Sequence, residues 1–211
     1  MTKNESQNAF WTISIFYWSM FDGLKSYLNS ISQFLDQVSV QLKQYEPPTG
    51  GEAEIEHSIA IERFEEQFPT LLTSSFIITL VSTLERELSK YCDTAARFSN
   101  IRIRLSDLRG SFHDQFKNYL SNVVKMSFDF QSDNWKDIKG LIEVRNAIVH
   151  NDGILEDSSR ANTIRNLNKR YPTLTIKGEV VEPTMLFCNQ MIQVVHDFLV
   201  SLTDAAYEHY K

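Results

Sequence analysis

The chain has 211 residues, of which 42% are hydrophobic and 23% charged, a balance typical of a soluble globular protein. We expect one domain over residues 1–211. The net charge of −6 argues against a general nucleic-acid binder, because non-specific affinity comes from neutralising phosphates. Cys92 and Cys188 are far apart and form no C-x-x-C pair, which indicates buried thiols in a reducing compartment. The aromatic run 9–21 is too short to cross a bilayer and follows no basic leader, so we expect a cytoplasmic protein without a membrane segment.

The first half of the chain is predicted to be helical. Apolar residues every three or four positions predict a long amphipathic helix over residues 8–44. A stretch rich in Pro and Gly then forms a linker over 46–51. A short acidic helix is expected over 52–67, and Pro69 is expected to open a second long helix.

Side chains that can cap helices suggest where the next two helices begin. Ser106 or Asp107 is a plausible N-cap for a helix that runs to about Met126. Asp133 or Asn134 is expected to cap the following helix.

That following helix, over about 134–152, carries the candidate motif and is expected to end near Gly153. A short polar helix is predicted over 158–169, and alternating residues over 174–182 predict a β-hairpin. A final helix is expected to begin at Pro183. The elements predict an all-α bundle of four to six helices, with a short β-hairpin before the last helix.

Charge is spread unevenly along the sequence. Residues 46–66 hold seven Glu against one Arg, whereas residues 160–177 hold five basic residues and no acidic one. A second basic run covers 97–109. Such runs are often solvated faces, but these two could also form a surface for RNA phosphates. The candidate RNA-binding residues are Arg102, Arg104, Arg109, Arg160 and Arg165.

The stretch Arg145-Asn146-Ala-Ile-Val-His150 is the best candidate for chemistry. On a helix, Arg145 falls within the buried apolar stripe, while Asn146 and His150 lie one turn apart on its flank. A guanidinium in that place needs an acidic partner such as Glu85 or Glu87, an anionic ligand, or a cleft between subunits. The trio could bind a phosphate, orient it and move a proton. The spacing is also common by chance, so an ordinary helix end with His150 near the dipole remains an alternative.

This stretch, at the end of a helix in an all-α bundle, resembles the R-x4-6-H signature of HEPN domains. The bundle resemblance covers residues 10–205, whereas the motif covers six residues. Glu85 also resembles an acidic position that recurs in some HEPN subfamilies. The resemblance implies a metal-independent endoribonuclease, often a toxin or an anti-phage defence effector, that dimerises so that two motifs face each other.

The resemblance also implies a role for each residue of the motif. His150 would activate the ribose 2′-OH or protonate the leaving oxygen, Arg145 would stabilise the transition-state charge, and Asn146 would orient the phosphate or the histidine. Asp152 stands where some HEPN toxins have a tyrosine that a partner antitoxin modifies, so that route of neutralisation is in doubt and a different antitoxin is left open.

Other kinds of site find no support in the sequence. There is no P-loop, dinucleotide fingerprint or nucleophile elbow, and no metal-ligand spacing, so we expect no metal and no cofactor. Two further hypotheses stay open. The chain could be a non-catalytic HEPN-like module that binds a nucleotide or a protein, or a structural helical protein in which the motif is accidental.

Overall fold

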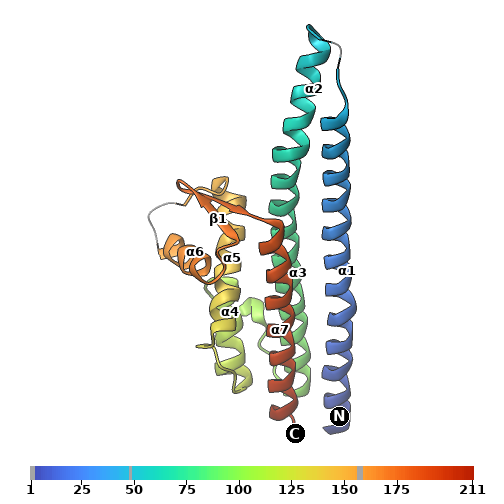
Figure 1. Ribbon diagram of the computed structural model, residues 1–211. Coiled ribbons are helices and arrows are strands. Elements are labelled where there is room, and N and C mark those ends of the chain that lie inside the picture. Colours follow the sequence, from blue (N-terminus) through green and yellow to red (C-terminus); the bar gives the residue numbers. More distant parts are fainter. Residues whose placement is uncertain (1–2, 48, 156–158) are drawn as a thin grey trace.

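The structure is a computed structural model that describes residues 3–47, 49–155 and 159–211, with side chains of the first helix described at Thr12 and from Phe16 onward. It confirms the predicted all-α class, with 77% of the chain in helices. Long helices pack side by side: α1 (Lys3–Gln44), α3 (Phe68–Phe98), α5 (Asp133–Asn151) and α7 (Met185–His209). Helices α1 and α5 lie on opposite sides of the α3 and α7 pair (Figure 1).

A single helical rod runs from α2 (Glu52–Glu62) through a π-helical turn (Arg63–Gln67) into α3. The predicted break before Pro69 is therefore wrong. The N–H of Phe68 bonds to the carbonyl of Arg63, five residues back, and the wider turn accommodates the proline in the first turn of α3. With α1, this rod forms a helical hairpin that projects beyond the rest of the bundle (Figure 1).

The segment between α3 and α5 differs from the sequence prediction at its start. A 3₁₀ turn spans Leu105–Asp107, and α4 spans Phe112–Asn118 before a π-helical turn over Tyr119–Val124. The N-cap of α4 is Ser111, whose hydroxyl accepts the N–H of Asp114, so neither Ser106 nor Asp107 caps it. Asp107 instead accepts a backbone N–H at 2.8 Å at the start of the 3₁₀ turn.

The last third of the chain follows the predicted order with small shifts. Ser132, and not Asp133 or Asn134, caps α5 by accepting the N–H of Trp135. Helix α6 spans Ser159–Arg170, and the predicted first residue of that helix, Ser158, lies outside the described residues.

The predicted hairpin is confirmed. Strands β1 (Leu174–Lys177) and β2 (Val180–Pro183) pair antiparallel, with Lys177 opposite Val180. Pro183 ends β2 and does not begin α7, because the N-cap of that helix is Thr184.

The core lies where α3 and α7 meet α1 on one side and α5 on the other. Tyr17 of α1, Leu84 of α3 and Ile138 of α5 are at most 1% exposed. Trp135 of α5 stacks on Phe198 of α7 with ring centroids 5.6 Å apart. These contacts fix α5, and with it the candidate motif, against the central pair of helices.

Two helical stretches are long and apolar enough to cross a membrane, namely 52–98 and Met185–His209. In each, 44% of the most apolar window is buried inside the protein. Both stretches supply the central helices of the bundle, which is the other ordinary reason for such composition.

Candidate functional site

The C-terminus of α5 is held in place by the hairpin. The helix ends at Asn151, and Asp152 (φ 50°) and Gly153 (φ 80°) turn the chain out of it. The carbonyl of Gly153 accepts the N–H of Val181 at 2.9 Å. A Cβ on Gly153 would lie 3.0 Å from the carbonyl oxygen of Val181. Glycine is therefore required at this position for two reasons, namely the positive φ and the close approach of the two backbones.

Arg145 pairs with Glu85 across the contact between α5 and α3. One terminal nitrogen of its guanidinium donates to Oε1 of Glu85, and the two side chains are 19% and 25% exposed. Glu87, the other predicted partner, is buried and instead accepts from Arg86 and Lys90 at 3.0 Å each. The Nε of Arg145 is buried, and no described residue accepts its hydrogen.

Asn146 and His150 line a cleft of about 280 Å³ between the end of α5 and the start of α6. The spacing of one helical turn predicted that they share a flank. Glu143, one turn before Asn146, lies in the same cleft and accepts its amide hydrogen at 3.5 Å. Arg160 supplies a cation from α6, with its Nε 3.8 Å from the carboxylate of Glu143. The remaining lining residues are Ala147, Asn151, Ile154, Leu155, Ser159, Ala161 and Ile164.

Arg145 does not enter this cleft. At about 100° per residue, Arg145 and His150 are roughly 140° apart around α5, whereas Asn146 and His150 are about 40° apart. Val149 lies between Arg145 and Asn146 on the helix surface and is 46% exposed. The arginine and the histidine of one chain therefore lie on adjacent faces of α5 and not around one point.

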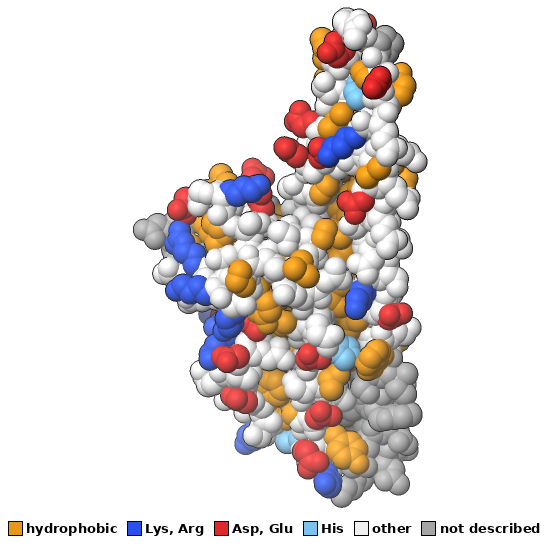
Figure 2. Space-filling view, viewed as in Figure 1, with side chains coloured by type: hydrophobic (Ala, Val, Ile, Leu, Met, Phe, Trp, Pro, Cys, Tyr) orange, Lys and Arg blue, Asp and Glu red, His pale blue; other side chains and the backbone are white. Residues whose placement is uncertain are grey.

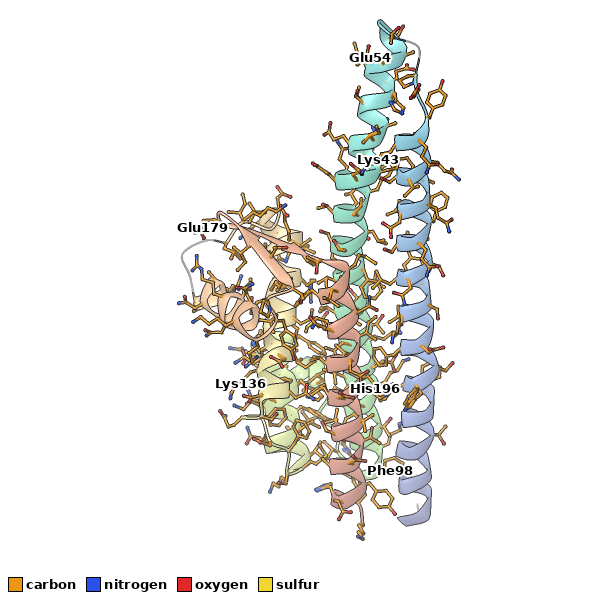
Figure 3. The ribbon with its side chains drawn as sticks, in the orientation of Figure 1. Lys43, Glu54, Phe98, Lys136, Glu179 and His196 are labelled. Atoms are coloured by element: carbon orange, nitrogen blue, oxygen red, sulfur yellow. The ribbon has the colours of Figure 1, made fainter. Side chains whose placement is uncertain are left out.

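Two of the basic candidates lie at the opposite end of α3 from the cleft. Arg102 and Arg104 line a shallow groove together with Arg97, just beyond the last turn of α3. Arg97 follows Glu85 by twelve residues, which is roughly 18 Å of helix. In Figure 3, Phe98 marks that end of α3, while Glu179 marks the hairpin beside the cleft.

The other candidates divide between the cleft and the outer surface. Arg160 alone of them lines the cleft. Arg165 pairs with Glu179 of the hairpin at 2.7 Å. Arg109 is exposed before α4, and Asp152 is exposed at the end of α5. Basic side chains nevertheless gather along the α6 side of the molecule (Figure 2), as the sequence run indicated.

Sequence reasoning missed two acidic residues of α5. One is Glu143, which the spacing of three residues to Asn146 could have placed on the same flank. The other is Asp137 of α5, whose carboxylate accepts from Arg170 and, at 2.8 Å, from the hydroxyl of Tyr171. Burial raises the pKa of Asp137. This contact fixes the end of α6 against the first turns of α5, away from the cleft.

Comparison of the chain with protein family models, with curated proteins and with solved structures gave no match. Within the described ranges, no three His, Cys, Asp or Glu side chains lie close enough together to hold a metal ion. The chemistry available at the cleft is therefore that of an imidazole, an amide, a guanidinium and a carboxylate.

Proposed function

We propose that this chain is a cytoplasmic, HEPN-type endoribonuclease that cleaves RNA without a metal ion. The observation that supports it best is the cleft at the end of α5, where His150 and Asn146 face Arg160. His150 is exposed, and none of the described residues hydrogen-bonds its imidazole. An exposed imidazole beside a cation and an amide can both bind a phosphodiester and exchange a proton with it.

The proposed reaction needs only groups that the chain supplies. Neutral His150 takes the proton from a ribose 2′-OH, and the oxygen attacks the adjacent phosphorus. The imidazolium that His150 thereby becomes gives the proton to the 5′-oxygen as the P–O5′ bond breaks, which leaves a 2′,3′-cyclic phosphate and a 5′-OH. Asn146 orients the phosphate, while the guanidinium groups of Arg160 and of Arg145 from a second copy stabilise the charge of the transition state.

A homodimer with facing motifs would bring Arg145 into this scheme. Arg145 of one chain points away from its own cleft, so it could serve a cleft formed with a second copy. Val149 and Ile154, exposed by 46% and 50%, offer apolar contact beside the motif. We further propose a role as a toxin or an anti-phage effector, with an antitoxin or another defence protein as its partner. Asp152 replaces the tyrosine that some antitoxins modify, so the neutralising partner would act differently.

Cleavage of labelled RNA by purified protein with EDTA present tests the proposal. We expect wild type to release products ending in a 2′,3′-cyclic phosphate, and His150→Ala and Arg145→Ala to lose that activity while keeping a cooperative unfolding transition. Arg160→Ala should weaken RNA binding and flatten its salt dependence, whereas Arg165→Ala should not, because Arg165 lies outside the cleft and pairs with Glu179 at 2.7 Å. Wild type without activity, or an active His150→Ala variant, contradicts the proposal.

A second candidate is a non-catalytic module that binds a nucleotide or a protein in the same cleft. Glu143 favours its protein-binding form, because a carboxylate 3.8 Å from Arg160 competes with any phosphate for that cation. Binding of nucleotides without cleavage of any RNA, with affinity raised by Glu143→Gln, would support this reading. Cleavage that depends on His150 would exclude it.

A further inference from the structure

Helix α1 carries a line of apolar side chains that is exposed over most of its length. Phe16, Tyr27 and Phe34 are 55–56% exposed and, at about 100° per residue, lie within roughly 20° of one another around the helix. Met20 and Val38 extend the line and are half-buried. We call these five residues the α1 seam.

Helix α1 itself carries no charged side chain beside the α1 seam, and Arg86 of α3, with its Nη2 3.8 Å from the sulfur of Met20, lies at the edge of the seam. The exposed residues of α1 beside the seam are Ser19, Gly23, Ser26, Ser30, Gln33, Gln37 and Gln41. The charged residues between Phe16 and Leu42 are Asp22, Lys25 and Asp36, and helical geometry places all three within about 60° of arc on another side. A solvent-exposed helix normally carries charges on its outer face, whereas interface cores lack them and are rich in Phe, Tyr and Met.

The seam also follows the spacing of a helix that packs against a partner helix. Met20, Tyr27 and Phe34 are seven residues apart, and Leu24 and Ile31 lie between them at the alternate positions of the same heptads. Alternating steps of three and four residues are typical of paired helices with knobs-into-holes packing. Contacts to α3 and α7 use a neighbouring stripe of fully buried side chains, namely Phe21, Leu28 and Leu35. Met20, Leu24 and Ile31 are partly buried against the core, so they join this stripe to the exposed seam beside it.

Gly23 also supports an interface on this side of α1. It lies inside a helix of 42 residues, and a Cβ on it would meet no atom within 4 Å. Glycine in a helix interior costs about 1 kcal/mol relative to alanine, and no contact or positive φ in this chain requires it. Together with Ser19, Ser26 and Ser30 it forms a line of small residues that lets another helix approach closely.

We propose that a second copy of this chain docks on the α1 seam, with the two α1 helices antiparallel. The chain carries a net charge of −6, so two copies repel each other least across a face that has no acidic side chain of its own helix and has Arg86 at its edge. Pairing around a two-fold axis beside Leu28 places Phe34 of each copy opposite Gly23 of the other, and Tyr27 opposite Ser30. Large side chains then face small ones.

The area available fits a stable dimer. The segment from Phe16 to Gln44 is roughly 43 Å long, and half the circumference of a helix about 10 Å wide is roughly 16 Å. The contact would bury about 700 Å² per copy, close to the ~800 Å² per partner of a typical specific interface. This contact differs from the facing-motif dimer, because α1 and α5 lie on opposite sides of the central pair (Figure 1). It does not rest on the proposed ribonuclease activity.

Sedimentation analysis of the full chain, over a range of micromolar concentrations, tests the interface. We expect wild type to have at least twice the 24.5 kDa mass of one chain, and Phe34→Lys to halve that mass. Val40→Lys is the matched control, since Val40 is 53% exposed on the same helix but lies off the seam. Its mass should equal that of wild type, and both variants should keep a cooperative urea unfolding transition.

Cross-linking gives a second readout. Cys92 and Cys188 are buried, so a cysteine added on the surface is the reactive one. A short bis-maleimide should join two chains of Ser30→Cys but not of Gln193→Cys on α7. Three results would overturn the proposal: a monomeric wild type, equal dissociation by Phe34→Lys and Val40→Lys, or dissociation by Val149→Lys alone. Seam-dependent binding of monomers to phosphatidylcholine vesicles would assign the seam to lipid instead.

Discussion

Removal of the acidic partner of Arg145 is expected to cost stability in a way that an ordinary surface ion pair does not. In Glu85→Gln, the guanidinium keeps its charge at a site that is only 19% exposed, next to its already unsatisfied Nε. A hydrogen bond to a charged group contributes about 1.5–3 kcal/mol, and breaking a fully buried pair costs about 3–5 kcal/mol. The half-buried pair should therefore lose about 2–3 kcal/mol of unfolding free energy. For a chain of this size, that lowers Tm by about 4–12 °C.

A double-mutant cycle measures the pair directly. Urea unfolding of Glu85→Gln, Arg145→Met and the double variant should give a coupling energy of about 1.5–3 kcal/mol. Arg165 and Glu179 form the matched control, because their side chains are 37% and 62% exposed at a similar type of contact. Exposed pairs couple by about 0–1 kcal/mol. A coupling below about 0.5 kcal/mol for Arg145 and Glu85 would refute the claim that burial makes this pair different.

Three further predictions concern the turn after α5, the contact between α5 and α6, and the two buried cysteines. Gly153→Ala should lower the urea midpoint more than Gly178→Ala, because both have positive φ but only Gly153 has a neighbouring carbonyl at 3.0 Å; equal losses would contradict this. Burial raises the pKa of Asp137 above 3.8, so the folded state holds this proton more tightly than the unfolded chain does. The contribution of Asp137 to the free energy of unfolding should therefore fall as the pH rises through its raised pKa. In urea titrations across the acidic range, Asp137→Asn should remove that decline. Burial raises the pKa of Cys188 to about 12 and that of Cys92 further, so a thiol reagent at mildly alkaline pH should label neither until the protein unfolds; labelling of the native protein would place a thiol at the surface.

The order of helices and strands was predictable because the periodicity of apolar residues is a local property of the sequence. The ends of α1 at Gln44 and of the motif helix near Gly153 were predicted to within two residues, since Pro, Gly and polar residues mark them. The hairpin was predicted from strict alternation around Lys177 and Gly178.

In the places where the prediction was wrong, tertiary contacts determine the backbone conformation. Pro69 normally starts or breaks a helix, but packing of the rod against α1 makes a π-helical turn preferable to a break. Ser111 and Ser132 cap helices where neighbouring Ser, Asp and Asn were equally suitable by type. Local propensity does not separate candidates that lie a few residues apart.

The candidate site also has a part that was predictable from the sequence and a part that depends on tertiary contacts. Helical projection placed Arg145 inward, and Asn146 beside His150, from spacing alone. Glu85 was one of two candidate partners, and only the packing of α5 on α3 separates it from Glu87. Arg160 lies in the cleft because α6 packs along α5. Contacts such as that of Arg170 with Asp137, 33 positions apart, hold the two helices together, and no periodicity reveals them.

Arg145 is hard to explain by stability alone. A buried ion pair roughly breaks even with apolar side chains of similar volume, and such replacements are often neutral or stabilising. Its position on α5 falls between Leu141 and Ile142 on one side and Ile148 and Val149 on the other, where an apolar residue would pack on α3 without needing Glu85 at all. When both partners are replaced by methionine, the free energy of unfolding should therefore lie within about 1 kcal/mol of the wild-type value or above it. If that variant also loses RNA cleavage, the arginine serves chemistry at a cost to the fold, as functional sites often do.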